Sequence, residues 1–471
     1  MKKSTFQNQS HHRRISVWLA ALGLLAICVA ARADWRISYG LDPIEDLDDL
    51  QINVSDGTLG RRLAFLSLAA VGSWMLARPG ASTLRVRGTL AGCLVALTAW
   101  CFASAAWSID PSLTLRRLFT LGATIVFAVA LAKHLSSRDA LRLACAYAGL
   151  QLGLDIAVAV ALGSFRPWES GYRFAGLLHP NHEAVNCALL FLSSIALARG
   201  AQQRGSSMVP GKQGCVAYRA LAALAFVMLF LTKSRTALLA TLIGYFLYRL
   251  QAVGRTTRIF AVSGAICAAC AAVLFSGGHV AHGLSSGVTL DRADSDVSTL
   301  TGRLPLWEEL FGDVAAEPLK GYGYGSFWSP RRIAAIFESQ GWPVSHAHCD
   351  YIELALALGL VGPFLYVAAL ILTLRSSQAA HREDDRAGHD GFSALIWFVA
   401  FGGVAEGVGL TFSVLQIIVI SAMARAGMIV AAPADEVEAA QDDLAGKTPC
   451  RQSDWKSRPN LRERLTGSQS Q

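Results

Sequence analysis

The sequence predicts an all-α, polytopic membrane protein with about twelve transmembrane helices. Of its 471 residues, 53% are hydrophobic and only 16% are charged, whereas a soluble domain averages about 25% charged residues. Apolar stretches recur along almost the whole chain. Several are long enough to cross a hydrocarbon core of roughly 30 Å at about 1.5 Å per residue. Most of the sequence therefore indicates one membrane domain rather than several soluble ones.

The N-terminus carries four basic residues ahead of the first apolar stretch, which covers residues 15–31. The Ala-Arg-Ala sequence at 31–33 resembles a signal-peptidase site, so a cleaved signal is one interpretation of this stretch. We expect an uncleaved first span instead, because further spans follow directly. The acidic segment 34–60 that comes next indicates an external loop.

Eleven further spans are predicted from apolar runs that end at polar loops. They cover residues 63–77, 88–107, 118–132, 140–163, 184–198, 220–232, 237–248, 259–276, 351–374, 392–410 and 412–430. Twelve spans divide the chain into five parts. These are a cytoplasmic N-terminus at 1–14, nine transmembrane helices within 15–276, an external loop at 277–348, three transmembrane helices within 349–430 and a disordered cytoplasmic tail at 431–471.

An even number of spans puts both termini on one side, and the Lys and Arg residues indicate which side. The loops assigned to the inside hold 20 of them, and the short loops assigned to the outside hold 10. Basic residues favour the cytoplasmic side of a membrane, so we expect both termini inside and the large loop between the ninth and tenth spans outside. This sidedness accounts for the net charge of +8, and no nucleic-acid partner is expected.

The region around the external loop contains two candidate amphipathic helices. Trp307, Leu310, Phe311 and Val314 follow helical spacing, and a second apolar face lies within 333–337. Both helices are expected to lie on the outer leaflet or to cap a cavity. The C-terminal tail is polar, mixed in charge and poor in aromatic residues, which favours disorder.

Arginines on the external side are the first candidates for chemistry. The sequence contains no P-loop, dinucleotide fingerprint, G-x-S-x-G or H-E-x-x-H motif. Arg173, Arg235 and Arg303 lie at external junctions. A single arginine there is explained by snorkelling to lipid headgroups. Several arginines with a histidine on the same side suggest a pocket for a diphosphate, because the guanidinium fork matches phosphate oxygens.

The junction between the external loop and the span at 351–374 carries the second group of candidates. His346, His348, Asp350 and Glu353 occur within eight residues. Such side chains are costly at the membrane boundary unless they are paired or reached by water. Histidine can exchange a proton near neutral pH, so this junction is where we expect acid–base chemistry.

Two further features allow two interpretations each. The segment Gly321–Gly325, with its alternating glycines and tyrosines, could bring backbone amides near a phosphate, but we favour interfacial tyrosine anchors. Asp155 and Glu406 lie inside predicted spans. Pairing with an arginine or with backbone groups is favoured over a direct role, although intramembrane carboxylates are functional candidates.

Several short segments resemble, in order and spacing, the O-antigen ligase and O-antigen polymerase superfamily of bacterial envelope proteins. The matching pieces are Trp107 to Ser112, Arg173 with Gly176 and His179-Pro180-Asn181, Lys233 to Ala237, Gly302-Arg303 with Trp307, Pro318-Leu319 with Gly321-Tyr322-Gly323, and His348 to Tyr351 with Gly359 to Gly362. The family usually has Asn after the histidine. This chain departs from that pattern with Cys349.

The resemblance implies a GT-C-like glycosyltransferase of the bacterial inner membrane that works at the periplasmic face without a metal ion or another cofactor. The donor would be an undecaprenyl-diphosphate-linked glycan. By similarity, Arg173 and Arg235 would hold the diphosphate, and Arg303 is a weaker candidate for the same role. His348 would be the general base that deprotonates the acceptor hydroxyl, giving inversion at the sugar carbon. His346 competes for that role.

Four more residues are expected to support this site, namely Asn181, Asp350, Tyr351 and Glu353. Of these, Asp350 or Glu353 would orient the imidazole of His348, because both are close to it in the sequence.

The acceptor and the class of activity stay open at this point. Lipid A core, a second lipid-linked glycan or a protein hydroxyl are all possible acceptors, so the chain is either a ligase or a polymerase of O-antigen or exopolysaccharide. A transporter or flippase for the same lipid is the alternative from another class, since twelve spans fit it too. Transporters commonly show repeated halves, and no internal repeat is visible in the sequence.

Overall fold

The computed structural model describes Gly23 and residues 59–78, 82–169, 171–203, 211–251, 303–342, 344–379 and 386–431. The predicted spans at 15–31 and 259–276, most of the external loop before Arg303 and the tail after Ala431 lie outside the described residues. Predictions about those parts of the chain stay untested.

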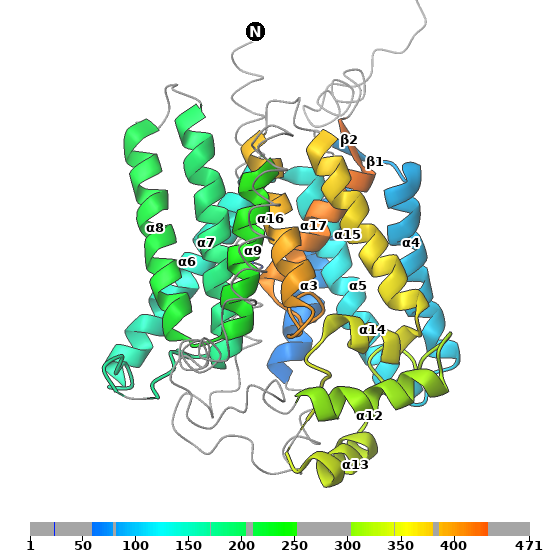
Figure 1. Cartoon of the computed structure of the whole chain (residues 1–471). Helices are drawn as coiled ribbons and strands as arrows, with labels where there is room; N and C mark the ends of the chain where they lie inside the picture. The colour runs from blue at the N-terminus through cyan, green and yellow to red at the C-terminus, as the bar shows by residue number, and fades with distance from the viewer. Residues whose placement is uncertain are drawn as a thin grey trace, which may run out of the picture.

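The described chain is almost entirely helical (Figure 1). The helices are α3 (Leu59–Ala77), α4 (Gly88–Ala103), the short 3-10 helix η2 (Ser104–Ala106), α5 (Pro111–His134), α6 (Ser137–Ala161), α7 (Pro180–Gln203), α8 (Gly211–Leu231), α9 (Arg235–Gln251), α12 (Arg303–Ala316), α13 (Pro330–Gln340), α14 (Asp350–Leu358), α15 (Val361–Ala379), α16 (Arg386–Gly402) and α17 (Val414–Met428). Two short strands, β1 (Ser82–Leu84) and β2 (Ile429–Ala431), pair antiparallel with Thr83 opposite Val430.

Five of the described helices are long and apolar enough to cross a membrane. They are Gly88–Ala106, Pro111–His134, Ser137–Ala161, Pro180–Ala201 and Gln213–Leu231. Two shorter apolar helices, Val361–Ser377 and Val414–Met428, accompany them. The chain is therefore a mostly helical, polytopic membrane protein. The count of twelve spans and the sidedness of the loops remain predictions.

Local sequence explains where several of these helices begin. Helix α5 starts at Pro111, a residue suited to the first helical turn, and the Asp110 side chain accepts a hydrogen bond from the backbone N–H of Leu113. Ser136 caps α6 in the same way through the N–H of Asp139. Within the bundle, α7 packs against α6, α8 and α16, while α17 packs against α5.

Two basic side chains, Lys133 and Arg425, and the small sheet of β1 and β2 hold one end of the bundle together. The Lys133 ammonium donates to the backbone oxygens of Leu76 and Arg78, which joins the ends of α3 and α5. The Arg425 guanidinium donates to the oxygen of Ala132 and joins the end of α17 to the end of α5. The loop after α3 and the chain after α17 thus lie at the same end of the bundle.

The predicted span at 351–374 is wrong as a single helix. It consists of α14, only nine residues long, followed by a break and α15. At the break Gly359 has φ 65°, and a Cβ on it would lie 2.3 Å from the carbonyl carbon of Leu319. The N–H groups of Tyr322 and Gly323 donate to the last carbonyls of α14. The loop at 322–323 therefore provides hydrogen-bond donors for the backbone carbonyls at the end of α14. Hydropathy does not reveal such a partner.

The predicted span at 392–410 also ends early. Helix α16 stops at Gly402, and residues 403–413 form an irregular segment before α17. The Asp350 carboxylate accepts hydrogen bonds from the N–H groups of Gly409 and Leu410 at 2.7 and 3.3 Å. Irregular backbone at a membrane boundary needs such partners, and here the partner comes from a helix about 60 residues earlier.

Helices α12 and α13 pack together at one end of the bundle, beside α14 (Figure 1). Leu306 and Leu310 of α12, with Ile333 and Ile336 of α13, are buried in a small apolar cluster that is separate from the main core. The predicted apolar face of α12 is only partly right, because Phe311 is 56% exposed.

The tyrosine-glycine segment belongs to this small cluster. Tyr322 is 8% exposed and packs on the ring of Phe327, with the ring centroids 5.2 Å apart. The expectation that Tyr322 is an interfacial anchor is therefore wrong. Its hydroxyl donates to the backbone oxygen of Asp313, so the segment links α12 to the end of α14.

The break after α14 leads to a stability prediction. Gly359→Ala should destabilise the protein strongly, because the added Cβ overlaps Leu319 and because φ 65° with ψ −172° is a conformation essentially restricted to glycine. Thermal unfolding of the detergent-purified chain measures the effect. The matched control is Gly341→Ala, which also has a positive φ, of 75°, but has open space around the added Cβ. Equal losses of stability in the two variants would contradict the proposed packing at Gly359.

Candidate functional site

A cavity of about 580 Å³ lies at the end of the bundle that carries α12 and α14. Its lining comes from segments far apart in the sequence, namely Arg173, His179, Asn181, Ser234, Arg235, Thr236, Leu239, Ala240, Ile243, Arg303, Trp342, His348, Phe401, Val404, Ala405 and Glu406. Five residues singled out from the sequence, Arg173, Arg235, Arg303, His348 and Asn181, thus meet in one cavity.

Helix N-termini converge on this cavity. Helix α7 begins at Pro180, α9 at Arg235 and α12 at Arg303, each beside or within the lining. The first N–H groups of a helix have no partner inside it, and the aligned peptide dipoles give that end a partial positive charge. Together with three arginines, these helix ends make the cavity attractive to an anion.

Arg173 is held in place by hydrogen bonds from its guanidinium. Its Nε donates to the backbone oxygen of Thr232 at 3.0 Å, and one terminal nitrogen donates to the Asn181 side-chain oxygen at 3.1 Å. The Asn181 amide in turn donates to the Glu406 carboxylate at 2.9 Å. Asn181 therefore connects Arg173 to Glu406.

Arg303 is paired with the same carboxylate. One of its terminal nitrogens lies 2.9 Å from Oε2 of Glu406, and another donates to the backbone oxygen of Ala405. A guanidinium has five N–H donors, so Arg303 keeps further donors for a ligand. Its position in the cavity lining is consistent with the weaker diphosphate-binding role expected for it.

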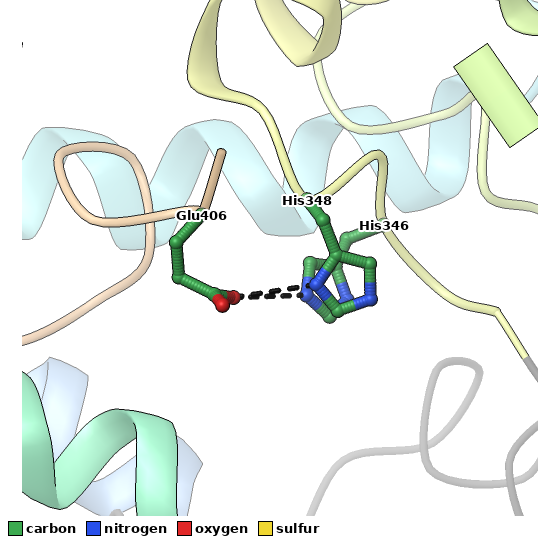
Figure 2. Close-up of side chains that lie close together, drawn as sticks. All are labelled: His346, His348 and Glu406. Atoms are coloured by element: carbon green, nitrogen blue, oxygen red, sulfur yellow. Dashed lines mark hydrogen bonds and ion pairs between the residues drawn. The ribbon is translucent and has the colours of Figure 1, made fainter. Parts of the chain in front are cut away.

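The two histidines of the junction lie side by side opposite Glu406 (Figure 2). Nδ1 of His348 is 3.3 Å from Oε1 of Glu406, and Nε2 of His346 is 4.0 Å from the same oxygen. The ring centroids are 3.9 Å apart. Since an ionised carboxylate only accepts hydrogen bonds, Nδ1 of His348 is assigned the proton, and Nε2 of the neutral ring is then the basic nitrogen.

Electrostatics keep Glu406 ionised in this arrangement. Burial alone would raise its pKa, but the hydrogen bond from His348 and the positive charge of Arg303 outweigh that effect and bring the pKa to about 2. The pKa of His346 shifts for a different reason, although 44% of its side chain is exposed. Its depth in the protein, with a smaller effect from His348, lowers the pKa of His346 below the ordinary value.

The backbone at His348 is in the left-handed region, with φ 50°. Residues other than glycine rarely adopt this conformation, and it costs of the order of 1–3 kcal/mol where it occurs. The hydrogen bond to Glu406 and the burial of the neighbouring Ala347 hold the residue there. Backbone strain of this kind clusters at functional sites.

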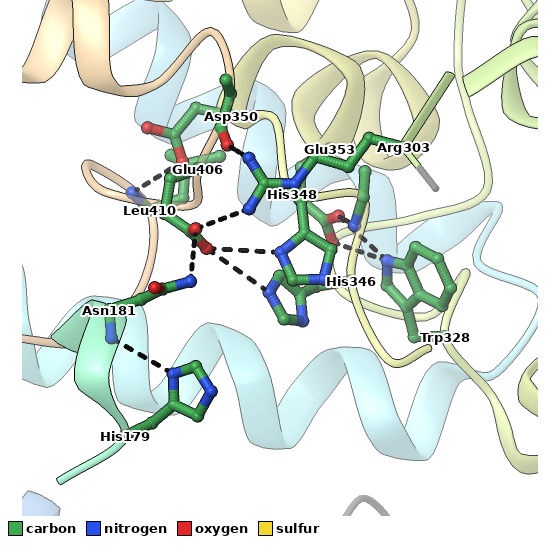
Figure 3. A network of polar contacts seen from close by, with 12 residues as sticks. His179, Asn181, Arg303, Trp328, His346, His348, Asp350, Glu353, Glu406 and Leu410 are labelled. Carbon is green, nitrogen blue, oxygen red and sulfur yellow. Dashed lines mark hydrogen bonds and ion pairs between the residues drawn. The ribbon is translucent and has the colours of Figure 1, made fainter. Parts of the chain in front are cut away.

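Asp350 and Glu353 do not orient the imidazole, so that expectation is wrong. Asp350 binds the N–H groups of residues 409 and 410 instead. Glu353 accepts hydrogen bonds from the Trp328 indole at 2.9 Å and from the N–H of Ala347 at 3.0 Å (Figure 3). The Glu353 carboxylate thus supports the loop before α14, and the Asp350 carboxylate supports the irregular segment after α16.

The Tyr351 hydroxyl donates to the backbone oxygen of Ala400 at 2.6 Å and ties α14 to α16. Asp155 is paired with the backbone, as favoured from the sequence. It accepts from the N–H of Leu177 at 3.0 Å. At Gly176, where φ is 60°, a Cβ would lie 2.4 Å from the Cβ of Asp155. This close approach positions the loop that carries Arg173.

Glu406 is the site residue that sequence reasoning undervalued. The expected pairing with an arginine is present, yet the carboxylate also contacts His348 and lines the cavity. Its signal in the sequence was an acidic residue inside an apolar stretch. Trp342, a further lining residue, carried no comparable signal.

His346, His348 and Glu406 offer three ligand atoms within 4.8 Å of one another, a spacing that a metal ion could use. The surroundings do not favour a cation. Glu406 already accepts from Arg303 and Asn181, and other arginines line the same cavity. Mutual repulsion between these charges and a divalent ion favours an acid–base role for the cluster.

The central part of the chain, residues 220–367, matches the model of the O-antigen ligase family. The resemblance noted in the sequence is thereby confirmed. No curated protein matches the sequence.

The segment that matches the family model contains only part of the site. Arg235, Arg303, His346 and His348 lie inside the matched residues, whereas Arg173 precedes them and Glu406 follows them. The departure at Cys349 falls at the N-cap of α14, where the side chain makes no capping hydrogen bond. Asn is a good capping residue, so this chain lacks a local contact that an Asn could make.

The low pKa of Glu406 leads to a prediction about stability and pH. A carboxyl whose pKa is lower in the folded than in the unfolded protein stabilises the fold fully above the unfolded value, near 4.3, and this gain is lost as the pH falls toward 2. Glu406→Gln should therefore reduce the free energy of unfolding at pH 6 by an amount on the order of 1–3 kcal/mol, and so lower the melting temperature. The difference from the natural protein should shrink between pH 5 and pH 3. Thermal unfolding at each pH measures it.

The matched control for this experiment is Glu308→Gln, which changes an exposed carboxylate on α12. It should leave the melting temperature nearly unchanged at every pH. A difference between Glu406→Gln and the natural protein that stays constant from pH 6 to pH 3 would show that the charge of Glu406 does not stabilise the fold.

Proposed function

We propose that this protein is a GT-C-like glycosyltransferase that moves a glycan from undecaprenyl diphosphate to an acceptor hydroxyl, with inversion at the sugar carbon. The reaction takes place at the periplasmic face of the bacterial inner membrane. The observation that carries the proposal is the meeting of three arginines, a histidine–carboxylate pair and an apolar wall in one cavity. The family match supports the general class of lipid-linked glycan transfer.

The cationic part of the cavity suits a diphosphate. Arg173 and Arg235 bind its oxygens, with Arg303 as a third contact, and the guanidinium fork allows bidentate hydrogen bonds. The helix N-termini at Pro180 and Arg235 add partial positive charge. These groups neutralise the leaving diphosphate, so the reaction uses no metal ion.

The apolar part of the cavity suits a prenyl chain. Leu239, Ala240 and Ile243 of α9, with Phe401 and Val404 at and after the end of α16, line the same cavity as the arginines. A lipid diphosphate needs both surfaces next to each other, because its charged head and its hydrocarbon tail are directly linked. A soluble nucleotide sugar would leave this apolar wall without a partner.

In the proposed reaction, Nε2 of His348 accepts the proton of the acceptor hydroxyl. The oxygen attacks the anomeric carbon as the bond from that carbon to the diphosphate oxygen breaks, and the lipid diphosphate departs with the electron pair. Glu406 holds the ring through Nδ1 and stabilises the imidazolium that forms. Attack from the face opposite the leaving group inverts the sugar carbon.

His348 is a better base than His346 in this arrangement. His348 has a carboxylate at hydrogen-bond distance, 3.3 Å, whereas the corresponding distance for His346 is 4.0 Å. The lowered pKa of His346 makes it a weaker base. His348 also lines the cavity with Arg173 and Arg235.

The acceptor defines whether the enzyme is a ligase or a polymerase. We propose transfer to lipid A core, as in an O-antigen ligase. Transfer to a second lipid-linked glycan would use the same residues, so the assay includes both acceptors. Product formation from lipid-linked glycan by the purified protein, without an ion gradient, separates an enzyme from a transporter.

His348→Ala should reduce glycan transfer by about 10²- to 10⁴-fold, the usual contribution of a general base. His346→Ala should reduce it much less. An in vitro assay with synthetic undecaprenyl-diphosphate glycan, normalised to folded protein, compares the two variants. The assignment is wrong if His346→Ala is inactive and His348→Ala is active. Two active variants would remove both histidines from the acid–base role.

Arg235→Lys keeps the charge but loses the planar fork, so transfer should fall by about 10- to 100-fold if the contact is bidentate. The matched control is Arg249→Lys, which makes the same change at the other end of α9. Full activity of Arg235→Lys would support a role in anchoring to headgroups instead. The same assay measures both variants.

A further inference from the structure

His179 lines the cavity, yet the proposed reaction does not use it. It stands directly before α7, and its backbone oxygen accepts hydrogen bonds from the N–H groups of His182 and Glu183 at 2.9 and 3.1 Å. Its ring nitrogen Nδ1 accepts from the N–H of Asn181 at 3.3 Å (Figure 3). The side chain therefore caps the helix, as Ser or Asp commonly does.

This cap determines the tautomer of the ring. A backbone N–H can only donate, so Nδ1 of His179 carries no proton, and the proton of the neutral ring is on Nε2. Burial, with smaller effects from His182 and Arg173, lowers the pKa of His179 to about 4. The ring is thus neutral at neutral pH and presents a fixed N–H donor.

The other ring nitrogen of His179, Nε2, takes no part in the helix cap. Figure 3 shows it on the side of the ring turned away from the start of α7. The other polar groups that line the same cavity include Arg173, Arg235 and Arg303. A neutral donor adds a hydrogen bond to an anion there without the mutual repulsion that a further cation would bring.

We propose that His179 binds the diphosphate of the lipid donor by donating its Nε2–H to a phosphate oxygen. This inference rests on the proposed function, since it assumes that the ligand of the cavity is a prenyl diphosphate. The helix cap holds the His179 ring in one orientation before the ligand binds. Binding therefore carries no entropic cost for ordering this side chain. The contact strengthens as negative charge grows on the departing diphosphate.

Two substitutions separate the two ring nitrogens. His179→Asn places an acceptor near the position of Nδ1 and preserves the cap, but it removes the donor. His179→Gln places an amide N–H near the position of Nε2 and preserves the donor, but it does not reproduce the cap. If His179 contacts the diphosphate, Gln should retain binding and Asn should lose it. If the residue only caps α7, Asn should behave like the natural protein and Gln should not.

The experiment measures binding of farnesyl diphosphate to the detergent-purified full chain by calorimetry, together with thermal unfolding. We expect His179→Asn to weaken binding by about 10- to 100-fold, the usual effect of losing a hydrogen bond to a charged group, with its melting temperature unchanged. His179→Gln should bind within a few-fold of the natural protein. In the transfer assay, the Asn variant should show a raised KM for the donor and a lowered kcat.

Each other outcome overturns the inference. Unchanged binding by His179→Asn, with active transfer by the natural protein, removes His179 from the donor site and leaves the proposed function intact. A natural protein that binds no farnesyl diphosphate and transfers no glycan overturns the proposed function as well. Weaker binding by Gln than by Asn, in step with a lower melting temperature, shows that the residue only caps the helix.

Discussion

The site depends on the carboxylate of Glu406. It accepts hydrogen bonds from the Arg303 guanidinium, the Asn181 amide and the His348 imidazole. These partners come from the start of α12, the start of α7 and the loop before α14. A carboxylate that is only 13% exposed would be costly if it were unpaired. Its full set of partners therefore holds three distant segments at fixed positions around one cavity.

The carboxylates of Asp350 and Glu353 hold backbone segments in place by accepting hydrogen bonds from N–H groups. Asp350 binds N–H groups of the irregular segment that follows α16, and that segment carries Glu406. Glu353 binds the N–H of Ala347, between the two histidines of the loop. Backbone that is neither helix nor strand at the membrane boundary needs such partners. The acidic residues of α14 thus support both sides of the histidine–carboxylate pair.

The cavity combines a cationic surface with an apolar one. Arginines and helix N-termini make one part attractive to anions, while α9 and the end of α16 contribute aliphatic and aromatic side chains. Such a combination fits a molecule with a charged head and an apolar tail. The two histidines differ in their distance from the Glu406 carboxylate. His348, the nearer one, has a hydrogen-bonded counter-charge, and His346 does not.

The sequence by itself determined the helices and most of the candidate residues. Apolar runs of sufficient length predict α4 to α8 because burial in lipid depends on local composition. Arg173, Arg235 and His348 were found because charged and titratable groups stand out against apolar surroundings. Only the tertiary structure decided the break at Gly359, the irregular segment before α17 and the role of Glu406. Each of these depends on a partner distant in the sequence, such as Leu319 for Gly359 or His348 for Glu406, and hydropathy contains no information about such pairs.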